Sequence, residues 1–144
     1  MPHLVILYTP NLDTKTDMTL LCRALADTML AQRDEAGQPV FPTGGTRVLA
    51  YPAAHYAVAD GGEAGRTAGG SGEYAFIYLN VRMAAGRSQA VKDKVGESIL
   101  TSAKIHLAPV FARHHIGMTV QVDEGAQAYD GKYSTLHPLF QKSS

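Results

Sequence analysis

Hydrophobic and polar positions divide the first half of the chain into a strand, a helix and a second strand. Residues 4–8 are continuously apolar, which is typical of a strand that is buried on both faces. From Met18 to about residue 33 the apolar residues recur at helical spacing, so this stretch is predicted to be a helix. Residues 46–58 have strand character, and Pro52 within them predicts a position at a sheet edge or at a bulge.

The second half repeats this order after a glycine-rich segment. Residues 60–73 contain six glycines and no large apolar side chain, so we expect a mobile loop there. A strongly β-prone run follows over residues 74–84. Ser88 can cap a second helix, which Pro109 is expected to end or kink. A short fourth strand is predicted over residues 118–122, before a tail.

These elements predict an α+β fold built from a duplicated β-α-β unit. We expect residues 1–144 to form a single domain, with the glycine-rich loop at 60–73 and a C-terminal tail at 125–144. Each unit contributes a parallel strand pair, which gives a four-stranded mixed sheet with two helices on one face. The first and third strands are apolar on consecutive residues, so the uncovered face would expose apolar side chains in a monomer. We therefore predict an oligomer that packs through that face.

Composition and charge narrow the possible functions. Lys plus Arg and Asp plus Glu number 13 each, so the formal charge is zero and no nucleic-acid partner is indicated. The apolar runs are shorter than the ~20 residues that span a bilayer, so no membrane association is expected. The amino-terminal residues lack the pattern of a secretory signal, and Cys22 is the single cysteine. A cytoplasmic protein without disulfides is therefore expected.

Common cofactor and metal motifs are missing from the sequence. The glycines of residues 60–73 form neither a phosphate-binding loop nor a dinucleotide fingerprint, so no nucleotide is implied. The six histidines form no H-E-x-x-H motif, and a metal site is not expected.

Pro2 is the first candidate for chemistry. If Met1 is removed, Pro2 becomes a secondary amine, which can act as a base without any side chain. The strand that follows at once would hold this terminus against the sheet instead of leaving it frayed. Many proteins begin with Met-Pro, so the alternative is a terminus without a catalytic role.

Arg87 is the second candidate, and Arg47 is a weaker third. Arg87 lies in the turn between the strand over residues 74–84 and the next helix, where a cation opposes the helix dipole. A carboxylate bound there would suit both the arginine and the helix N-terminus. The alternative is an ordinary solvated arginine, and Arg47 at the start of the second strand is open to the same two interpretations.

Several short motifs recur in order along nearly the whole chain and together carry a resemblance. They are Met1-Pro2-His3, Phe41-Pro42, Gly45-Thr46-Arg47, Ala59-Asp60-Gly61, Tyr74-Ala75-Phe76, Ala85-Gly86-Arg87-Ser88 and His137-Pro138-Leu139-Phe140. In this order and spacing they resemble the 5-carboxymethyl-2-hydroxymuconate isomerase family of the tautomerase superfamily.

The resemblance implies a homotrimer of tautomerase-like subunits that uses neither a metal nor an organic cofactor. It implies that Pro2 is the catalytic base, that Arg87 is catalytic and binds substrate, and that Arg47 also binds substrate. The implied reaction moves a proton from the 2-hydroxyl group to carbon 5 of a small unsaturated polycarboxylate. Leu49 stands where the family usually keeps a second arginine, and residues 60–73 resemble an insertion.

Two alternatives stay open at this point. One is another activity of the superfamily, such as dehalogenation or hydration of an unsaturated acid. The other is a non-catalytic trimeric ligand-binding or scaffold protein of the same fold. The second alternative predicts that Met1 is retained and that Arg87 faces solvent or forms a structural ion pair.

Overall fold

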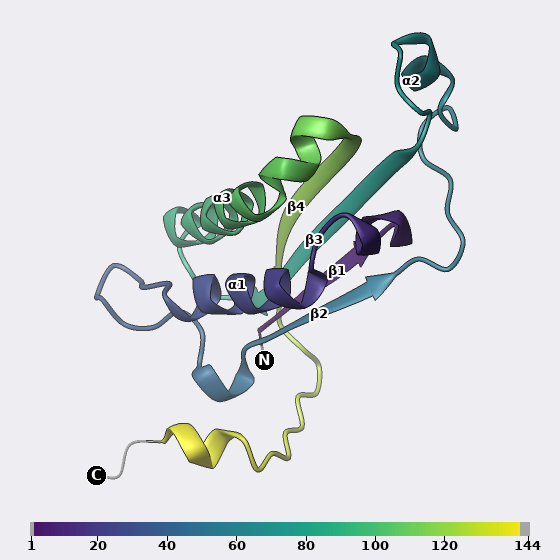
Figure 1. The fold of residues 1–144 in the computed structure, drawn as a ribbon. Coiled ribbons are helices and arrows are strands. Elements are labelled where there is room, and N and C mark those ends of the chain that lie inside the picture. Colours follow the sequence, from purple (N-terminus) through teal and green to yellow (C-terminus); the bar gives the residue numbers. More distant parts are fainter. Residues whose placement is uncertain (1, 142–144) are drawn as a thin grey trace.

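A four-stranded sheet organises the chain, which is described here over residues 2–141 by a computed structural model (Figure 1). In chain order the elements are β1 (His3–Tyr8), η1 (Pro10–Thr14), α1 (Met18–Leu30), η2 (Thr43–Gly45), β2 (Arg47–Pro52), α2 (Glu63–Thr67), β3 (Tyr74–Ala84), α3 (Gln89–Arg113), β4 (His115–Gly125) and η3 (His137–Phe140). The strand order is β2-β1-β3-β4, with β1 parallel to β2, β3 parallel to β4, and β1 antiparallel to β3. The predicted mixed sheet with two parallel pairs is confirmed.

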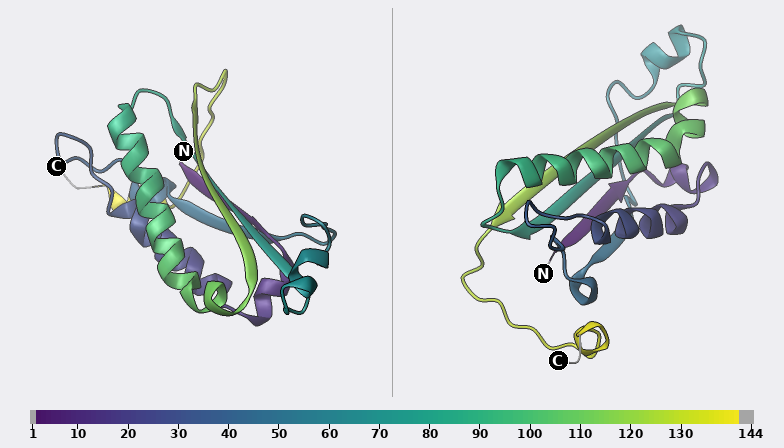
Figure 2. Two further views of the ribbon diagram at one scale, coloured as in Figure 1. Left: turned by 90° about the horizontal axis from the view of Figure 1, so that it is seen from above. Right: turned by 90° about the vertical axis from the view of Figure 1, so that its left-hand side faces the viewer.

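Helices α1 and α3 lie on the same face of the sheet, as both views of Figure 2 show. Alternate residues of β1 and β3 point toward them, and Leu4, Ile6 and Ile77 are completely buried there. The helices contribute their apolar stripes, which include Leu25 and Ile99. Burying one such side chain contributes about 1.5–3 kcal/mol, so this single layer supplies most of the hydrophobic stabilisation of the chain.

The ends of several elements differ from the sequence prediction. Helix α1 ends at Leu30, three residues earlier than expected, and β2 ends at Pro52, which occupies the predicted sheet edge. Pro109 does not end α3, because the neighbouring Leu107 and Val110 are buried against the core while the proline faces solvent. Tertiary packing therefore offsets the hydrogen bond that proline cannot make.

Strand β4 is also longer than predicted, eleven residues instead of five. It lies at the edge of the sheet, and alternate residues such as Met118 and Val122 pack toward the core. The alternating residues of β4 on the other face, which include Gly117, Gln121 and Asp123, belong to the uncovered side of the sheet. About half of the residues in β4 are therefore polar or small. For this reason the hydrophobic pattern predicted a shorter strand.

The glycine-rich segment contains a short helix, α2 (Glu63–Thr67), where the sequence predicted only a loop over residues 60–73. The Asp60 carboxylate accepts hydrogen bonds from the backbone N–H groups of Gly62 and Ala64, both at 2.9 Å, and so caps α2. Gly62 has a φ of 113°, and a Cβ atom there would lie 2.1 Å from the carbonyl oxygen of Gly72. The glycines thus allow two backbone segments to touch. The resulting knob extends beyond the sheet next to the start of β3 (Figure 1).

The face of the sheet opposite the helices carries exposed apolar side chains, mainly on β1 and β2 rather than on the first and third strands as the sequence predicted. Leu7, Leu49 and Tyr51 are 48%, 42% and 51% exposed, on neighbouring positions of β1 and β2. On the β3–β4 side this face carries Phe76, which is 36% exposed, but is otherwise mainly polar, and Asn80 donates a hydrogen bond to Asp123 at 2.8 Å. Among residues 2–141, none of the helices combines the length and apolarity required to cross a bilayer.

The capping of α2 predicts a local dependence on pH. The backbone N–H groups of Ala64 and Gly62 lower the pKa of Asp60 from 3.8 to about 2. Because the folded-state pKa is depressed, the stabilisation is present above about pH 4 and is lost as the pH falls toward about 2. We expect the protection factor of the Ala64 amide in hydrogen exchange to fall over this interval. The Asp60→Asn variant should show weak protection that no longer changes with pH; unchanged protection of the wild type at about pH 2 would contradict the assignment.

Candidate active site

A cavity of about 270 Å³ lies at the end of the sheet where β1 begins and β3 ends. Its walls come from four parts of the chain: the amino terminus, the segment after α1, the β3–α3 turn and the C-terminal tail. The lining residues are Pro2, Val40, Phe41, Pro42, Met83, Ala84, Arg87, Gln127, Asp130, Lys132 and His137. This combination of apolar walls and a few charged groups is typical of a small-molecule site.

Pro2 is buried in this cavity, immediately before the first residue of β1. Strand β1 is hydrogen-bonded on both sides, to β2 and to β3, so the start of the strand is fixed. Phe41 and Met83, each 3% exposed, contribute apolar wall beside it. Such surroundings favour the neutral form of an amine. Met1, whose removal would create that amine, lies outside the described residues.

Arg87 lines the same cavity, so the structure brings the first two candidate residues together. Its Nη2 donates a hydrogen bond to the carbonyl oxygen of Val40 at 3.0 Å. Its Nη1 lies 3.3 Å from Oδ2 of Asp34. A guanidinium group has five N–H donors, so these two interactions orient it without using its full capacity.

Asp34 is itself fixed in a tight turn. Its Oδ1 accepts hydrogen bonds from the backbone N–H groups of Ala36 and Gln38, both at 2.9 Å. The Gln38 bond is the main reason that the pKa of Asp34 lies below its ordinary value, and the Ala36 bond and Arg87 lower it further. The carboxylate therefore stays ionised and holds Arg87 in place. The structural ion pair that the non-catalytic alternative predicts is present, and Arg87 still faces the cavity of Pro2.

Arg47 does not line that cavity. It pairs with His3 in the β1–β2 register, and its Nη1 donates a hydrogen bond to the carbonyl oxygen of Gly45 at 3.2 Å. Arg47 lines a separate hollow of about 420 Å³, together with Cys22 on α1 and Phe140 in the tail. In the single chain, Arg47 is therefore close to Pro2 in the sheet register but lines a different hollow.

The tail supplies site residues that sequence reasoning missed. The cavity is also lined by tail residues within 126–141, which leave the end of β4 and lie below the sheet in Figure 1: Gln127, Asp130, Lys132 and His137. The tail is fastened where η3 packs on η2: a Cβ atom at Gly44 would lie only 2.9 Å from Cα of His137. The His-Pro-Leu-Phe motif was a signal that this segment matters, but nothing local in the sequence indicated which cavity it borders.

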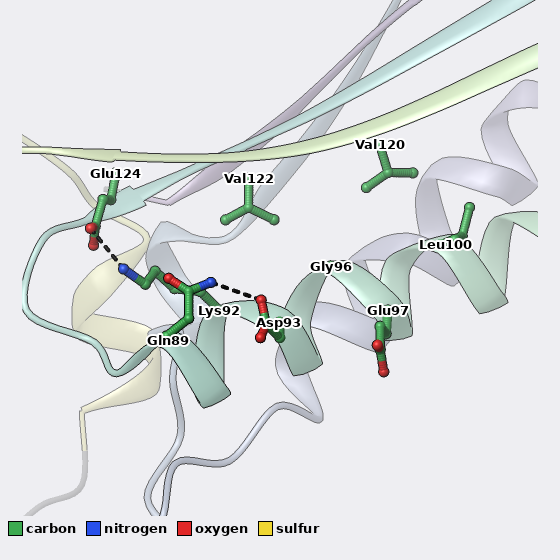
Figure 3. Close-up of a pocket in the computed structure, with 9 residues that line it drawn as sticks. All are labelled: Gln89, Lys92, Asp93, Gly96, Glu97, Leu100, Val120, Val122 and Glu124. Carbon is green, nitrogen blue, oxygen red and sulfur yellow. Dashed lines mark hydrogen bonds and ion pairs between the residues drawn. The ribbon is translucent and has the colours of Figure 1, made fainter.

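A second hollow, of about 550 Å³, lies between α3 and the edge strand β4 (Figure 3). Its lysine, Lys92, is paired with Glu124 at 2.8 Å, and Gln89 donates a hydrogen bond to Asp93 at 2.8 Å. The floor is formed by small and apolar residues that include Gly96. Neither Pro2 nor Arg87 lines this hollow, so it is separate from the candidate site.

Other titratable groups with shifted pKa values have structural roles. Burial, followed by a hydrogen bond to Asp13, raises the pKa of Tyr8 to about 12. Burial also raises the pKa of the Cys22 thiol, which disfavours the thiolate that a nucleophile requires. Within the described part of the chain, no group of three or more His, Cys, Asp or Glu side chains could hold a metal ion.

Comparisons with known proteins cover the whole of this architecture. The model of the 5-carboxymethyl-2-hydroxymuconate isomerase family matches residues 2–140. The 5-carboxymethyl-2-hydroxymuconate Delta-isomerase of Escherichia coli is 22% identical over 140 residues, which are 97% of this chain and 99% of the relative.

Two solved structures extend the likeness to three dimensions. A crystal structure of a 5-carboxymethyl-2-hydroxymuconate delta-isomerase is 59% identical, with a TM-score of 0.96 over 100% of this chain and 95% of the other. A 5-carboxymethyl-2-hydroxymuconate isomerase from Deinococcus radiodurans R1 is 30% identical, with a TM-score of 0.79 over 98% of this chain and 95% of the other. The similarity therefore spans the sheet, the helices and the tail together.

Proposed function

The chain belongs to the 5-carboxymethyl-2-hydroxymuconate isomerase family, and from this premise we propose that Pro2 and Arg87 carry out its isomerase reaction. The predicted family, the tautomerase-like fold and the isomerase class are confirmed. The single observation that supports the assignment of residues is that Pro2 and Arg87 line one cavity.

In the proposed reaction the nitrogen of Pro2, freed by removal of Met1, acts as the base. It accepts the proton of the 2-hydroxyl group of the dienol substrate, and the oxygen becomes a carbonyl. The double bonds shift by one position, and the protonated proline returns a proton to carbon 5. The product is the conjugated 2-oxo acid, and no oxidant or cofactor is consumed. An amine that cycles between two protonation states is suited to such a transfer near neutral pH.

Arg87 is proposed to bind the carboxylate next to the reacting oxygen and to stabilise the negative charge that develops on that oxygen. Its guanidinium is oriented by Asp34 and by the carbonyl oxygen of Val40 before the substrate arrives. Preorganised donors of this kind are effective because they need no rearrangement during the reaction. The apolar wall of Phe41 and Met83 limits water around the charge and strengthens its interactions.

Arg47 is part of the proposal as a second carboxylate-binding residue. The support is its position in the sheet register beside His3, one residue from Pro2. A homotrimer is proposed as the working assembly, and the exposed Leu7, Leu49 and Tyr51 support it. Apolar side chains grouped on one sheet face lose contact with water when copies of the chain pack through that face.

The first test concerns the base. Mass spectrometry of the native protein should give a mass lower than that of the full chain by one methionine residue. In that processed protein, Pro2→Ala leaves a primary amine in place, so we expect kcat for ketonisation of the dienol to fall about 10–100-fold rather than to vanish. Processed protein without any ketonisation, or full activity with Met1 retained, would sink the proposal, because an acylated nitrogen cannot accept a proton.

The second test separates the chemical role of Arg87 from its ion pair. Arg87→Ala removes both, and we expect kcat/KM to fall about 100-fold, as for other lost donors to a developing oxyanion. Asp34→Asn removes the ion pair but keeps the arginine, and should lower kcat/KM less than about tenfold. Equal losses in the two variants would show that Arg87 acts only as a structural residue.

The third test concerns the assembly. Analytical ultracentrifugation should give three times the chain mass of 15.4 kDa. Leu49→Glu places a charge on the apolar sheet face and should dissociate the complex. Leu20→Glu is the matched control, because Leu20 is 60% exposed on α1. A wild-type protein that sediments as a monomer, or a Leu49→Glu variant that stays trimeric, is the contrary outcome.

A further inference from the structure

Two oppositely charged residues of the tail, Lys132 and Asp130, line the Pro2 cavity. Nζ of Lys132 lies 2.6 Å from Oδ2 of Asp130. The side chains are 45% and 41% exposed, so they are accessible from solvent as well as from the cavity. They face the site from the tail, whereas Arg87 enters it from the β3–α3 turn.

This ion pair is not what fastens the tail. Exposed ion pairs contribute little to stability, since each charge is well solvated without its partner. The tail is held by the packing of η3 on η2, where Gly44 and His137 approach closely. Lys132 can therefore exchange Asp130 for another carboxylate without releasing the segment that carries it.

We propose that Lys132 binds the carboxylate of the substrate's carboxymethyl group, and that Asp130 occupies this subsite in the empty enzyme. The proposal rests on the proposed function, which places a substrate with three carboxylates in the cavity. Arg87 is engaged by the carboxylate beside the reacting oxygen, and Lys132 is a second cation in the same cavity, on a different wall. A lysine ammonium forms strong charge-assisted hydrogen bonds with a carboxylate.

Asp130 opposes binding in this arrangement. Its hydrogen bond from Lys132 holds the pKa of the Asp130 carboxyl below its ordinary value, so the group is negatively charged at neutral pH. An arriving polycarboxylate has the same sign of charge and competes for the same ammonium. Asp130 thus selects for substrates whose additional carboxylate interacts with Lys132 strongly enough to displace it.

The test compares two dienols in the processed enzyme: 5-carboxymethyl-2-hydroxymuconate, and 2-hydroxymuconate, which lacks the carboxymethyl group. Lys132→Gln should lower kcat/KM about tenfold for the first substrate, mainly through KM, and change it less than about twofold for the second. Asp130→Asn should lower KM for the first substrate. Lys15→Gln, which breaks an ion pair with Glu73 at the other end of the sheet, away from the cavity, is the control and should change neither.

The two variants distinguish a binding subsite from a structural ion pair. If Lys132 and Asp130 only stabilised the tail, both variants would impair both substrates in the same direction, and that result would overturn the proposal. Opposite effects of the two variants, confined to the substrate with the carboxymethyl group, support it.

A binding measurement keeps this inference separate from the proposed function. If the processed wild type ketonises neither dienol, the proposed function fails, and calorimetry with propane-1,2,3-tricarboxylate then tests the subsite by itself. An affinity about tenfold weaker in Lys132→Gln than in the wild type supports the subsite. Equal affinities, or no binding to the wild type, overturn it.

Discussion

The hydrogen bonding of β1 on both of its sides is the constraint on which the site depends. An amino terminus is usually frayed, and a frayed amine cannot be held against a substrate. Here the residues after Pro2 enter the centre of the sheet at once, and alternate side chains such as Leu4 and Ile6 are completely buried. The packing of the core therefore also fixes the position of the Pro2 backbone nitrogen.

Arg87 is held in position by an ion pair rather than by the sheet. Arg87 follows β3 in a turn and is oriented by Asp34, a carboxylate that backbone N–H groups already stabilise in its charged form. An ion pair and a binding role are therefore compatible, because the pair lies on one side of the guanidinium and the cavity is lined by the same residue. The tail adds Lys132 with its own carboxylate partner, so both cations of the cavity stand next to a carboxylate in the free chain. Such pairing keeps an empty site electrostatically balanced.

The sheet has two unlike faces, and each has a consequence beyond the single chain. The helix-covered face provides the core, while the other presents Leu7, Leu49 and Tyr51 to solvent. Leu49 occupies the position where the family resemblance leads one to expect an arginine, so this chain presents an exposed apolar side chain there instead of a charge.

Much of the fold could be predicted from the sequence because its period and order are local properties. The continuous apolar run of β1, the helical spacing of α1 and the limits of β3 follow from neighbouring residues, and the Met-Pro opening and the Ala-Gly-Arg-Ser turn identified Pro2 and Arg87. The length of β4, the passage of α3 through Pro109 and the folded knob around Asp60 could not be predicted in this way. Each depends on packing or capping between residues whose pattern alone favours a shorter strand, a broken helix or a loop.

The same distinction between local and long-range properties applies to the site. The sequence by itself determined which groups could act, since a terminal proline and an arginine in a strand-to-helix turn are recognisable without coordinates. Only the tertiary structure decided that these two share a cavity, that Arg47 lines a different hollow, and that Lys132 and Asp130 approach from the tail. The reason is that a cavity is assembled from segments far apart in the chain, and their meeting depends on long-range contacts such as that between Gly44 and His137.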